Sequence, residues 1–470
     1  MMEKMSKWSA MSVLLSNAMD IMGYNTEMIR CRQETYRTLD KISNINNKDG
    51  PCTRFTTGGK AEGIARYFES DIDHLHTVKH VICTDKPLYI DHSNILTLFK
   101  VENENTPPGY VKLKLLEHNG NCLKEEISAS LFENSSGEKY ISSIKFTENI
   151  KESTIWLPGF TTQAKSGPSS PVSNGYLSID RVVSFRCFLP RDQNILRNRS
   201  ELSRCRDVND TSFGFESQVH AVPVGNSYSA DKYLEWRLSY TEAELNLVRN
   251  LSHADLKVYI FLKLVARSIF KPVCNEMTSY LMKNVILWTS SRCCHNSKRR
   301  SNILDTLQCC LEFLRKCLVT NYLPSFMLPR RNLFRGRVGL HENKKLQSIL
   351  TDMLNSGPAM IFCCNKVKIA IHSLIKIPEM FKEYSLYRNE IEKMILVLCT
   401  CRARLRTHGV TQEQYDKLLI RDRLYRTTKL KILAKIGLYD PSAENEAEDV
   451  EKILKSTKGE YYERLSRMLS

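Results

Sequence analysis

The chain has 470 residues, 42% of them apolar and 26% charged, and carries a formal net charge of +16. This composition is typical of a soluble globular protein, and the length exceeds one simple core, so we expect two or three domains or lobes. No stretch reaches the ~20 consecutive apolar residues of a membrane span, and the first residues lack the features of a signal peptide. The sequence therefore predicts a cytoplasmic protein without a membrane segment, whose cysteines are reduced thiols.

The positive charge is confined to the second half of the chain. Residues 1–250 hold 30 Lys and Arg against 31 Asp and Glu, whereas residues 251–470 hold 38 against 21. Lys and Arg that neutralise phosphates release counterions, so a polyanionic partner is one interpretation. A solvated basic surface is the other.

The apolar spacing divides the chain into three parts. Residues 3–42 carry apolar side chains at helical spacing, which predicts one long or bent helix. From Asp73 to about residue 187, short β-rich runs alternate with turn signals, for example YVKLKLL, YISSIKF and YLSIDRVVSFRC. From Leu234 onward the pattern is helical almost to the end, and the tail from Asp440 is predicted to be a short helix or a loosely held extension.

Two glycines and two carboxylates lie close together after the first predicted helix. Gly58 and Gly59 lack Cβ atoms, so their backbone N–H groups can approach a triphosphate. Asp71 and Asp73 are two residues apart, and on a strand such side chains point to the same face, where they can share divalent cations. The alternatives are a chance D-x-D and an ordinary glycine turn.

Asp180 is a lone acid in the last β-rich run, between Ile179 and Val182. A buried carboxylate is costly unless it meets a cation. It is interpreted either as a third ligand for the ions held by Asp71 and Asp73, or as the partner of a nearby arginine such as Arg181 or Arg186.

These features together resemble a known family. The segments, in chain order, are GG-x-x-E at 58–62, D-I-D at 71–73, SID at 178–180, WRLSYTEAE at 236–244, SYLMKNVILW at 279–288 and CLEFLRKCLVTNYLPSFMLPRRNLF at 310–334. Their order and spacing resemble those of the male abnormal 21 family, which includes cyclic GMP–AMP synthase and the cGAS-like receptors of animals. The resemblance covers roughly residues 5 to 405.

The resemblance implies an α+β, bilobal nucleotidyltransferase fold. A long N-terminal spine helix and a mixed twisted β-sheet carry the catalytic acids, and an all-helical C-terminal lobe closes the nucleotide cleft. The expected divisions are a spine helix at 1–45, a nucleotidyltransferase core at 46–233, a helical lobe at 234–410 and a helical extension at 411–470.

The resemblance also implies the site residues. Asp71, Asp73 and Asp180 match the catalytic, metal-binding acids, which would hold two Mg²⁺ ions, with Mn²⁺ as the alternative. The nucleotide-binding positions that match are Gly58, Gly59, Arg237, Ser239, Lys283 and Phe313. Phosphate contact suits Arg237 and Lys283, and a Phe face can stack on a base. An ordinary surface cation at Arg237 and a core position for Phe313 are the structural alternatives.

Two departures from the family pattern bear on the function. Gly59 stands where the family loop usually has serine, so a hydroxyl that would grip phosphate is missing, with Thr57 or backbone amides as substitutes. The histidine-and-cysteine zinc insertion that vertebrate cyclic GMP–AMP synthase has just before the segment matched by 277–288 is absent, since only Cys274 lies there. Cys293, Cys294 and His295 are adjacent and do not make a tetrahedral set, so no zinc is expected.

Without that zinc element, double-stranded RNA is favoured over DNA as the activating ligand. RNA would be met through its backbone and shape. The candidate contacts are Lys298, Arg299, Arg300, Arg330, Arg331, Arg335 and Arg337, each of which is otherwise part of a solvated face.

The expected function is a nucleic-acid-activated, metal-dependent synthase of a cyclic dinucleotide messenger, made from ATP, GTP or other NTPs in antiviral innate immunity. A dimer formed on the ligand is left open. The alternatives are a catalytically inactive family member that serves as a ligand-binding or protein-interaction module, and an enzyme that extends RNA ends.

Overall fold

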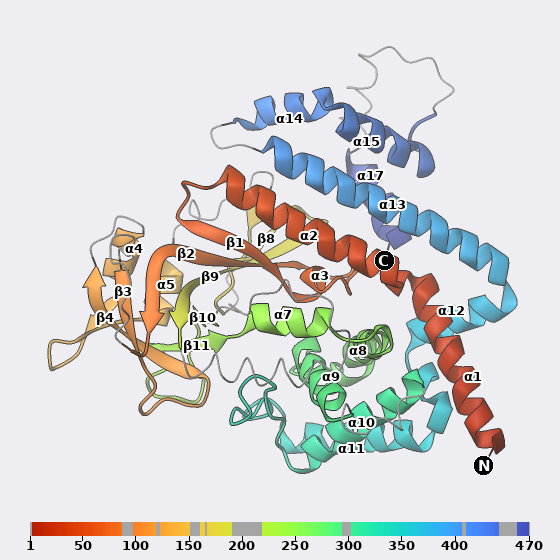
Figure 1. Cartoon of the computed structure of the whole chain (residues 1–470), viewed down its shortest axis with the longest axis horizontal. Coiled ribbons are helices and arrows are strands. Elements are labelled where there is room, and N and C mark those ends of the chain that lie inside the picture. Colours follow the sequence, from red (N-terminus) through yellow and green to blue (C-terminus); the bar gives the residue numbers. More distant parts are fainter. Residues whose placement is uncertain are drawn as a thin grey trace.

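The computed structural model describes residues 2–86, 97–118, 123–150, 160–164, 167–189, 219–293, 302–406, 410–440 and 458–469. The chain has an α+β architecture, in which a mixed sheet in the first half is followed by a helical region (Figure 1). The α+β class that the sequence predicts is therefore confirmed.

The N-terminal segment consists of two helices. Helix α1 spans Met2–Met19 and α2 spans Thr26–Asn46, with a short π-helical segment between them. Gly23 has φ +93° there, and a Cβ atom would lie 2.8 Å from Nη2 of Arg388. The side chain of Asn25 then accepts a hydrogen bond from the backbone N–H of Met28 and begins α2. The bend that the sequence left open thus lies at Gly23.

Eleven strands are described, and they form one mixed sheet. Their bounds are β1 Cys52–Thr57, β2 Ile72–Thr84, β3 Thr97–Glu102, β4 Tyr110–His118, β5 Leu131–Glu133, β6 Lys139–Ile141, β7 Thr161–Thr162, β8 Val172–Ser173, β9 Ser178–Phe188, β10 Val219–Val222 and β11 Glu235–Ser239. The order is β1-β2-β3-β4-β11-β10-β9-β8-β7, and β2 also pairs with β9. Because β2 pairs in parallel with both β3 and β9, the sheet closes on itself around this long strand.

The helices of residues 241–355 form a layer below the sheet in the view of Figure 1, whereas the helices of residues 378–435 lie above it. Their bounds, with those of the short helices in the sheet region, are α3 Gly58–Ala61, α4 Lys124–Ala129, α5 Ser143–Asn149, α7 Thr241–Arg249, α8 His253–Val265, α9 Ser279–Cys293, α10 Ile303–Val319, α11 Leu340–Asn355, α12 Asn365–Lys376, α13 Pro378–Leu405, α14 Gln412–Arg421, α15 Arg423–Lys435 and α17 Lys458–Leu469. A 3-10 segment spans Gly357–Cys363, before α12.

Three apolar clusters hold these layers together. One joins α1 to the helical region, with Phe261, Leu311 and Leu350 among its buried members. A second lies between the sheet and its covering helices and contains Phe185 and Trp236, whose rings stack at 4.9 Å. The third joins α2 and α13 to the C-terminal helices. The described end of the chain, α17, is thus docked on the body of the protein.

A buried ion pair connects helix α2 with helix α13. Arg32 in α2 meets the carboxylate of Glu392 in α13 through two atoms, with Nε to Oε1 at 2.8 Å and Nη2 to Oε2 at 2.7 Å. Glu392 also accepts a hydrogen bond from the backbone N–H of Tyr67. Arg32 donates to the carbonyls of Gly23 and Gly63 as well. The loop before β2 is therefore held from both helices.

Two details of the sequence prediction are wrong. The run YISSIKF is only partly a strand, because Ser142 accepts a hydrogen bond from the N–H of Lys145 and begins α5. The helical pattern expected from Leu234 onward begins at Thr241, because residues 235–239 pair with β4 and β10 as β11. Within the described ranges, no single helix is long and apolar enough to cross a membrane; a pair bent by 105°, Gly357–Cys363 and Asn365–Lys376, meets the test only when taken together.

Candidate functional site

A cavity of about 980 Å³ lies between the sheet and the helical layer. Acidic residues of β2 and β9 line it together with the glycines after β1, and basic residues of β11, α8 and α9 line it as well. The predicted site residues that it brings together are Gly58, Gly59, Asp71, Asp73, Asp180, Arg237, Ser239 and Lys283. Segments more than two hundred residues apart in the sequence thus meet in one cleft.

The two strand carboxylates lie side by side on a parallel strand pair. Asp73 of β2 is the register partner of Asp180 of β9, and Asp71 lies just before β2. Asp180 accepts a hydrogen bond from Oγ of Ser169 at 3.1 Å. The guanidinium of Arg181, considered as its partner from the sequence, donates instead to the carbonyl of Ser170.

The acids interact electrostatically. Burial, then the carboxylates of Asp180 and Asp71, raises the pKa of Asp73 to about 7. Burial and Asp180 also raise the pKa of Asp71. Carboxylates that disfavour one another's charge in this way gain stability when a cation joins them.

The glycine loop lies directly against Asp73. Gly58 has φ +65°, in the left-handed region, and a Cβ atom there would come within 2.1 Å of Oδ2 of Asp73. At Gly59 a Cβ atom would lie 2.8 Å from Nζ of Lys263. Gly58 is therefore required by conformation and by space, whereas the nearest obstacle at Gly59 is the end of a flexible side chain.

Lys283 forms ion pairs with two carboxylates at the base of the cavity. Its Nζ lies 2.8 Å from Oε1 of Glu62 and 3.4 Å from Oε2 of Glu244. Burial lowers the pKa of Lys283, but Glu62 and Glu244 outweigh it and hold the pKa well above its ordinary value. Glu62 also accepts a hydrogen bond from Tyr259. In this arrangement Lys283 neutralises protein carboxylates.

Arg237 belongs to a group of three arginines that line the cavity. Burial, then the neighbouring charge of Arg331, lowers the pKa of Arg237, and Arg337 adds to the effect. Guanidinium groups that repel one another form a site for a polyanion such as a triphosphate. Ser239, two residues further along β11, shares a hydrogen bond of 2.6 Å with Oγ1 of Thr241.

Phe313 does not line this cavity. Its side chain packs against the helical core from α10, where apolar residues recur at helical spacing. The aromatic side chains that line the cavity are Tyr240, Tyr259 and Tyr280. Tyr280 donates a hydrogen bond to Oε1 of Glu244 at 3.1 Å. It lies within the quoted motif SYLMK, three residues before Lys283, so the signal for it was present in the sequence.

The sequence interpretation also missed three basic residues. Lys263 of α8, Arg267 and Lys271 line the cavity. Burial lowers the pKa of Lys263, while Glu62 and Glu69 oppose this effect. Lys263 lies in an apolar helical run, so the sequence alone does not indicate that its side chain points into the cavity.

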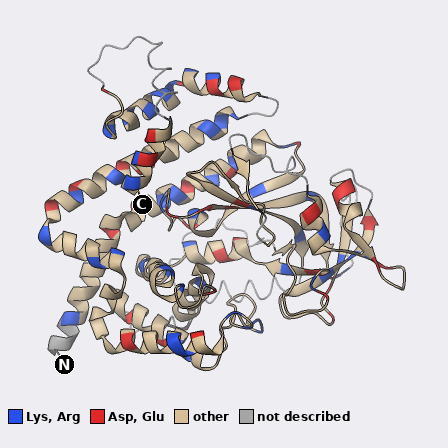
Figure 2. Cartoon of the chain, turned by 180° about the vertical axis from the view of Figure 1, so that it is seen from behind, with Lys and Arg blue, Asp and Glu red and all other residues tan. Residues whose placement is uncertain are grey.

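The basic residues considered for nucleic acid are partly described. Arg331 and Arg337 line the cavity, and with Arg330 and Arg335 they also line a second one beside it. Lys298, Arg299 and Arg300 lie outside the described residues, as do Cys294 and His295. Lys and Arg recur along the C-terminal helices as well, interspersed with acidic positions (Figure 2).

The donor set of Asp71, Asp73 and Asp180 fits hard divalent cations in its chemistry, because carboxylate oxygens are the ligands of Mg²⁺ and Mn²⁺. The position of Asp73 supports the fit, since its carboxyl is buried beside the carboxylates of Asp180 and Asp71, which together raise its pKa to about 7. In the described part of the chain, no group of three or more His, Cys, Asp or Glu side chains is already positioned as a ligand set. Ion binding would therefore draw the carboxylates together.

The helical region identifies the class of protein. Residues 246–354 match the family model described as Mab-21 protein HhH/H2TH-like domain. This segment runs from within α7 to the end of α11 and carries Lys263, Lys283 and Arg337. The match supports a Mab-21 protein of the cGAS-like nucleotidyltransferase type.

Proposed function

We propose that this protein is a metal-dependent nucleotidyltransferase with the bilobal fold of its family. The carrying observation is the single cavity in which Asp71, Asp73 and Asp180 meet the glycine loop and a group of cations. Bound Mg²⁺ or Mn²⁺ would supply Lewis-acid activation of the attacking hydroxyl and of the phosphate.

The residues of the cleft would bind the phosphates and the base and accept the proton. The loop of Gly58 and Gly59 lines the cleft against Asp73, where its backbone N–H groups can approach phosphates. Arg237 with Arg331 and Arg337 would neutralise the phosphate charge. Tyr280 offers an aromatic face for a base. Asp180 is placed on the strand beside Asp73, where it can take up the proton of the attacking ribose hydroxyl.

We further propose that the product is a cyclic dinucleotide made from two NTPs in innate immune signalling. The activating ligand would be double-stranded RNA, and the enzyme would act in the cytoplasm. The support is the positive charge of the second half of the chain and the match of residues 246–354 to a Mab-21 domain.

The test is incubation of the purified protein with labelled ATP, GTP, CTP and UTP, Mg²⁺ or Mn²⁺, and duplex RNA or DNA. We expect a small cyclic product that Asp73→Asn abolishes. Asp352→Asn, an exposed acid of α11, is the matched control and should retain activity. Absence of product with every nucleotide pair and both ions would refute catalysis, and elongation of labelled RNA would instead indicate an RNA-extending enzyme.

Two observations favour a second candidate, a nucleotide-binding module without turnover. Lys283 is held by Glu62 and Glu244, and the loop lacks a hydroxyl at Gly59. Such a module would be stabilised thermally by triphosphate with metal while forming no product.

A further inference from the structure

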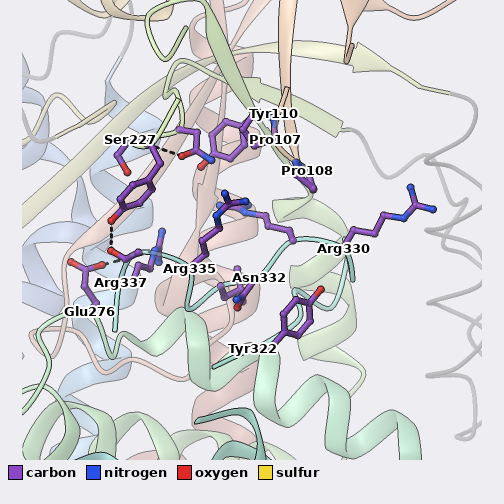
Figure 3. A pocket seen from close by; sticks show the side chains of 15 residues that line it. Pro107, Pro108, Tyr110, Ser227, Glu276, Tyr322, Arg330, Asn332, Arg335 and Arg337 are labelled. Carbon is purple, nitrogen blue, oxygen red and sulfur yellow. Dashed lines mark hydrogen bonds and ion pairs between the residues drawn. The ribbon is translucent and has the colours of Figure 1, made fainter. Parts of the chain in front are cut away.

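A second cavity, of about 570 Å³, lies beside the cleft (Figure 3). Its walls come from the turn before β4 at residues 107–110, the segment 226–228 and the segment 322–337. Arg331 and Arg337 line both cavities. The second cavity therefore adjoins the cleft at these two arginines, and its other lining residues do not line the cleft.

The main chain of this lining is fixed by internal hydrogen bonds. Oδ1 of Asn332 accepts from the N–H groups of Leu323 and Phe334 at 3.0 and 2.9 Å. The N–H of Leu333 donates to the carbonyl of Leu323 at 2.7 Å. The arginines therefore project from an ordered segment instead of a loose loop.

Glycine permits close contact between this segment and the opposite wall. Gly336 has φ +68°, and a Cβ atom there would come within 2.0 Å of the ring of Tyr228. The hydroxyl of Tyr228 donates a hydrogen bond to the carbonyl of Gly336. Gly109 likewise lies close to the side chain of Arg331. The segment 322–337 thus contacts each of the other two wall segments, 226–228 and 107–110.

Positive charge in the cavity exceeds negative charge. Among the described residues, four arginines line it, and Glu276 is the one carboxylate of its lining. Glu276 lies 4.0 Å from Nε of Arg337, at the limit of an ion pair. Among the residues that the structure describes, no carboxylate forms an ion pair with Arg330, Arg331 or Arg335. An anion with several oxygens would supply the missing counter-charge.

Aromatic faces accompany these cations. Tyr228 is 64% exposed and Tyr322 is 40% exposed, although both are large side chains. The guanidinium of Arg331 lies 5.5 Å from the ring centre of Tyr110. Exposed aromatic rings beside guanidinium groups are a combination that suits a base and its phosphates.

We propose that this cavity binds one nucleotide, with its phosphates on the arginines and its base against Tyr228 or Tyr322. The volume suits a single small ligand, since pockets for such ligands measure roughly 300–1,000 Å³. A duplex needs an extended surface, whereas this lining is concave and shared between two walls. The proposal does not depend on turnover in the cleft.

The first test is titration of the full-length protein with a fluorescent ATP analogue in EDTA, because arginines bind phosphates without a metal ion. Arg330→Ala with Arg335→Ala changes residues that line only the second cavity. We expect at least tenfold weaker binding. The matched control is Arg421→Ala with Arg423→Ala, which removes the same charge from exposed positions of α14 and α15.

A cleft variant, Lys263→Ala with Arg267→Ala, assigns the binding to one cavity. The nucleotide affinity in EDTA should survive in this variant. The proposal is overturned if the cleft variant loses the affinity and the Arg330–Arg335 variant retains it. It is also overturned if the latter loses duplex RNA binding while its ATP affinity is unchanged.

The second test separates the base from the phosphates. In the wild type, ATP should bind more tightly than inorganic tripolyphosphate, and Tyr228→Leu with Tyr322→Leu should remove the difference. Equal affinities in the wild type would overturn the role of the aromatic rings. Thermal denaturation of each variant checks that it is folded.

Discussion

Asp73 and Asp180 are register partners on neighbouring parallel strands, although 107 positions separate them in the sequence. Partners in a parallel pair point to the same face of the sheet, so the two carboxylates share one side of the cleft. Asp71 joins them electrostatically from the residue before β2.

The first prediction concerns the pH dependence of stability. The pKa of Asp73 is about 7 in the folded protein and 3.8 in its ordinary state. The folded state therefore binds more protons than the unfolded state, and its free energy of unfolding falls as pH rises from about 4 to about 7. Asp73→Asn should remove about 3 kcal/mol of this fall between pH 4.5 and 8. Urea denaturation in EDTA at pH 4.5 and 8 measures it, with Asp352→Asn as the control.

The second prediction concerns metal affinity. Below pH 7, a divalent ion must displace the proton of Asp73, so the affinity for Mn²⁺ should rise by about tenfold per pH unit up to the pKa. Above pH 8 it should level off. Thermal stabilisation by Mn²⁺ at a series of pH values measures this dependence. A pH-independent effect would show that Asp73 is not a ligand.

The third prediction contrasts the two loop glycines. Gly58→Ala forces a side chain into the left-handed region and against Asp73, and should lower the free energy of unfolding by about 1–3 kcal/mol. At Gly59 the added Cβ atom of Gly59→Ser would meet the flexible end of Lys263 at 2.8 Å and Cβ of Ala65 at 3.2 Å. Both contacts need only small shifts, so the cost should stay below about 1 kcal/mol. The added hydroxyl should also tighten ATP binding in the presence of metal. Weaker binding in Gly59→Ser would contradict that expectation.

The fourth prediction concerns Lys283. Lys283→Met leaves the buried carboxylates of Glu62 and Glu244 without their cation and should cost about 3–5 kcal/mol. Urea denaturation at pH 7.5 measures the loss. Adding Glu62→Gln should recover part of it. If Lys283→Met is as stable as the wild type, the ion pairs do not form in solution.

The fifth prediction concerns the pair that joins α2 to α13. Arg32→Met leaves Glu392 buried without its bidentate partner, so a loss of about 3–5 kcal/mol is expected. In the double variant Arg32→Met with Glu392→Met, at least half of the loss should return, because both charges are gone. The surface pair Lys417–Glu413 serves as the control, since such exposed pairs contribute about 0–1 kcal/mol.

Many residues of the cleft could be predicted from the sequence. The spacing of Asp71 and Asp73, the lone acid at Asp180 and the motif around Arg237 all depend on local patterns that persist in the fold. The resemblance implied that these acids share one site, whereas the parallel pairing of β2 with β9, which brings them together, was not predicted.

Other features depend on contacts that no local pattern records. Phe313 was placed in the site from its position in a motif, but the apolar face of α10 turns it toward the core. The partners of Lys283 come from two distant segments, at Glu62 and Glu244. The strand β11 was read as helix because its pairing partners are remote.

The contacts of Glu392 set an order for how the protein matures on the ribosome. The chain is made from its N-terminus, so Arg32 and the backbone N–H of Tyr67 leave the ribosome long before Glu392 does. Until α13 emerges, both lack the carboxylate that joins them in the finished fold. The loop leading to Asp71 therefore reaches its final state only when most of the chain has been synthesised, and a nascent protein stalled before residue 392 would have its acids but no settled cleft.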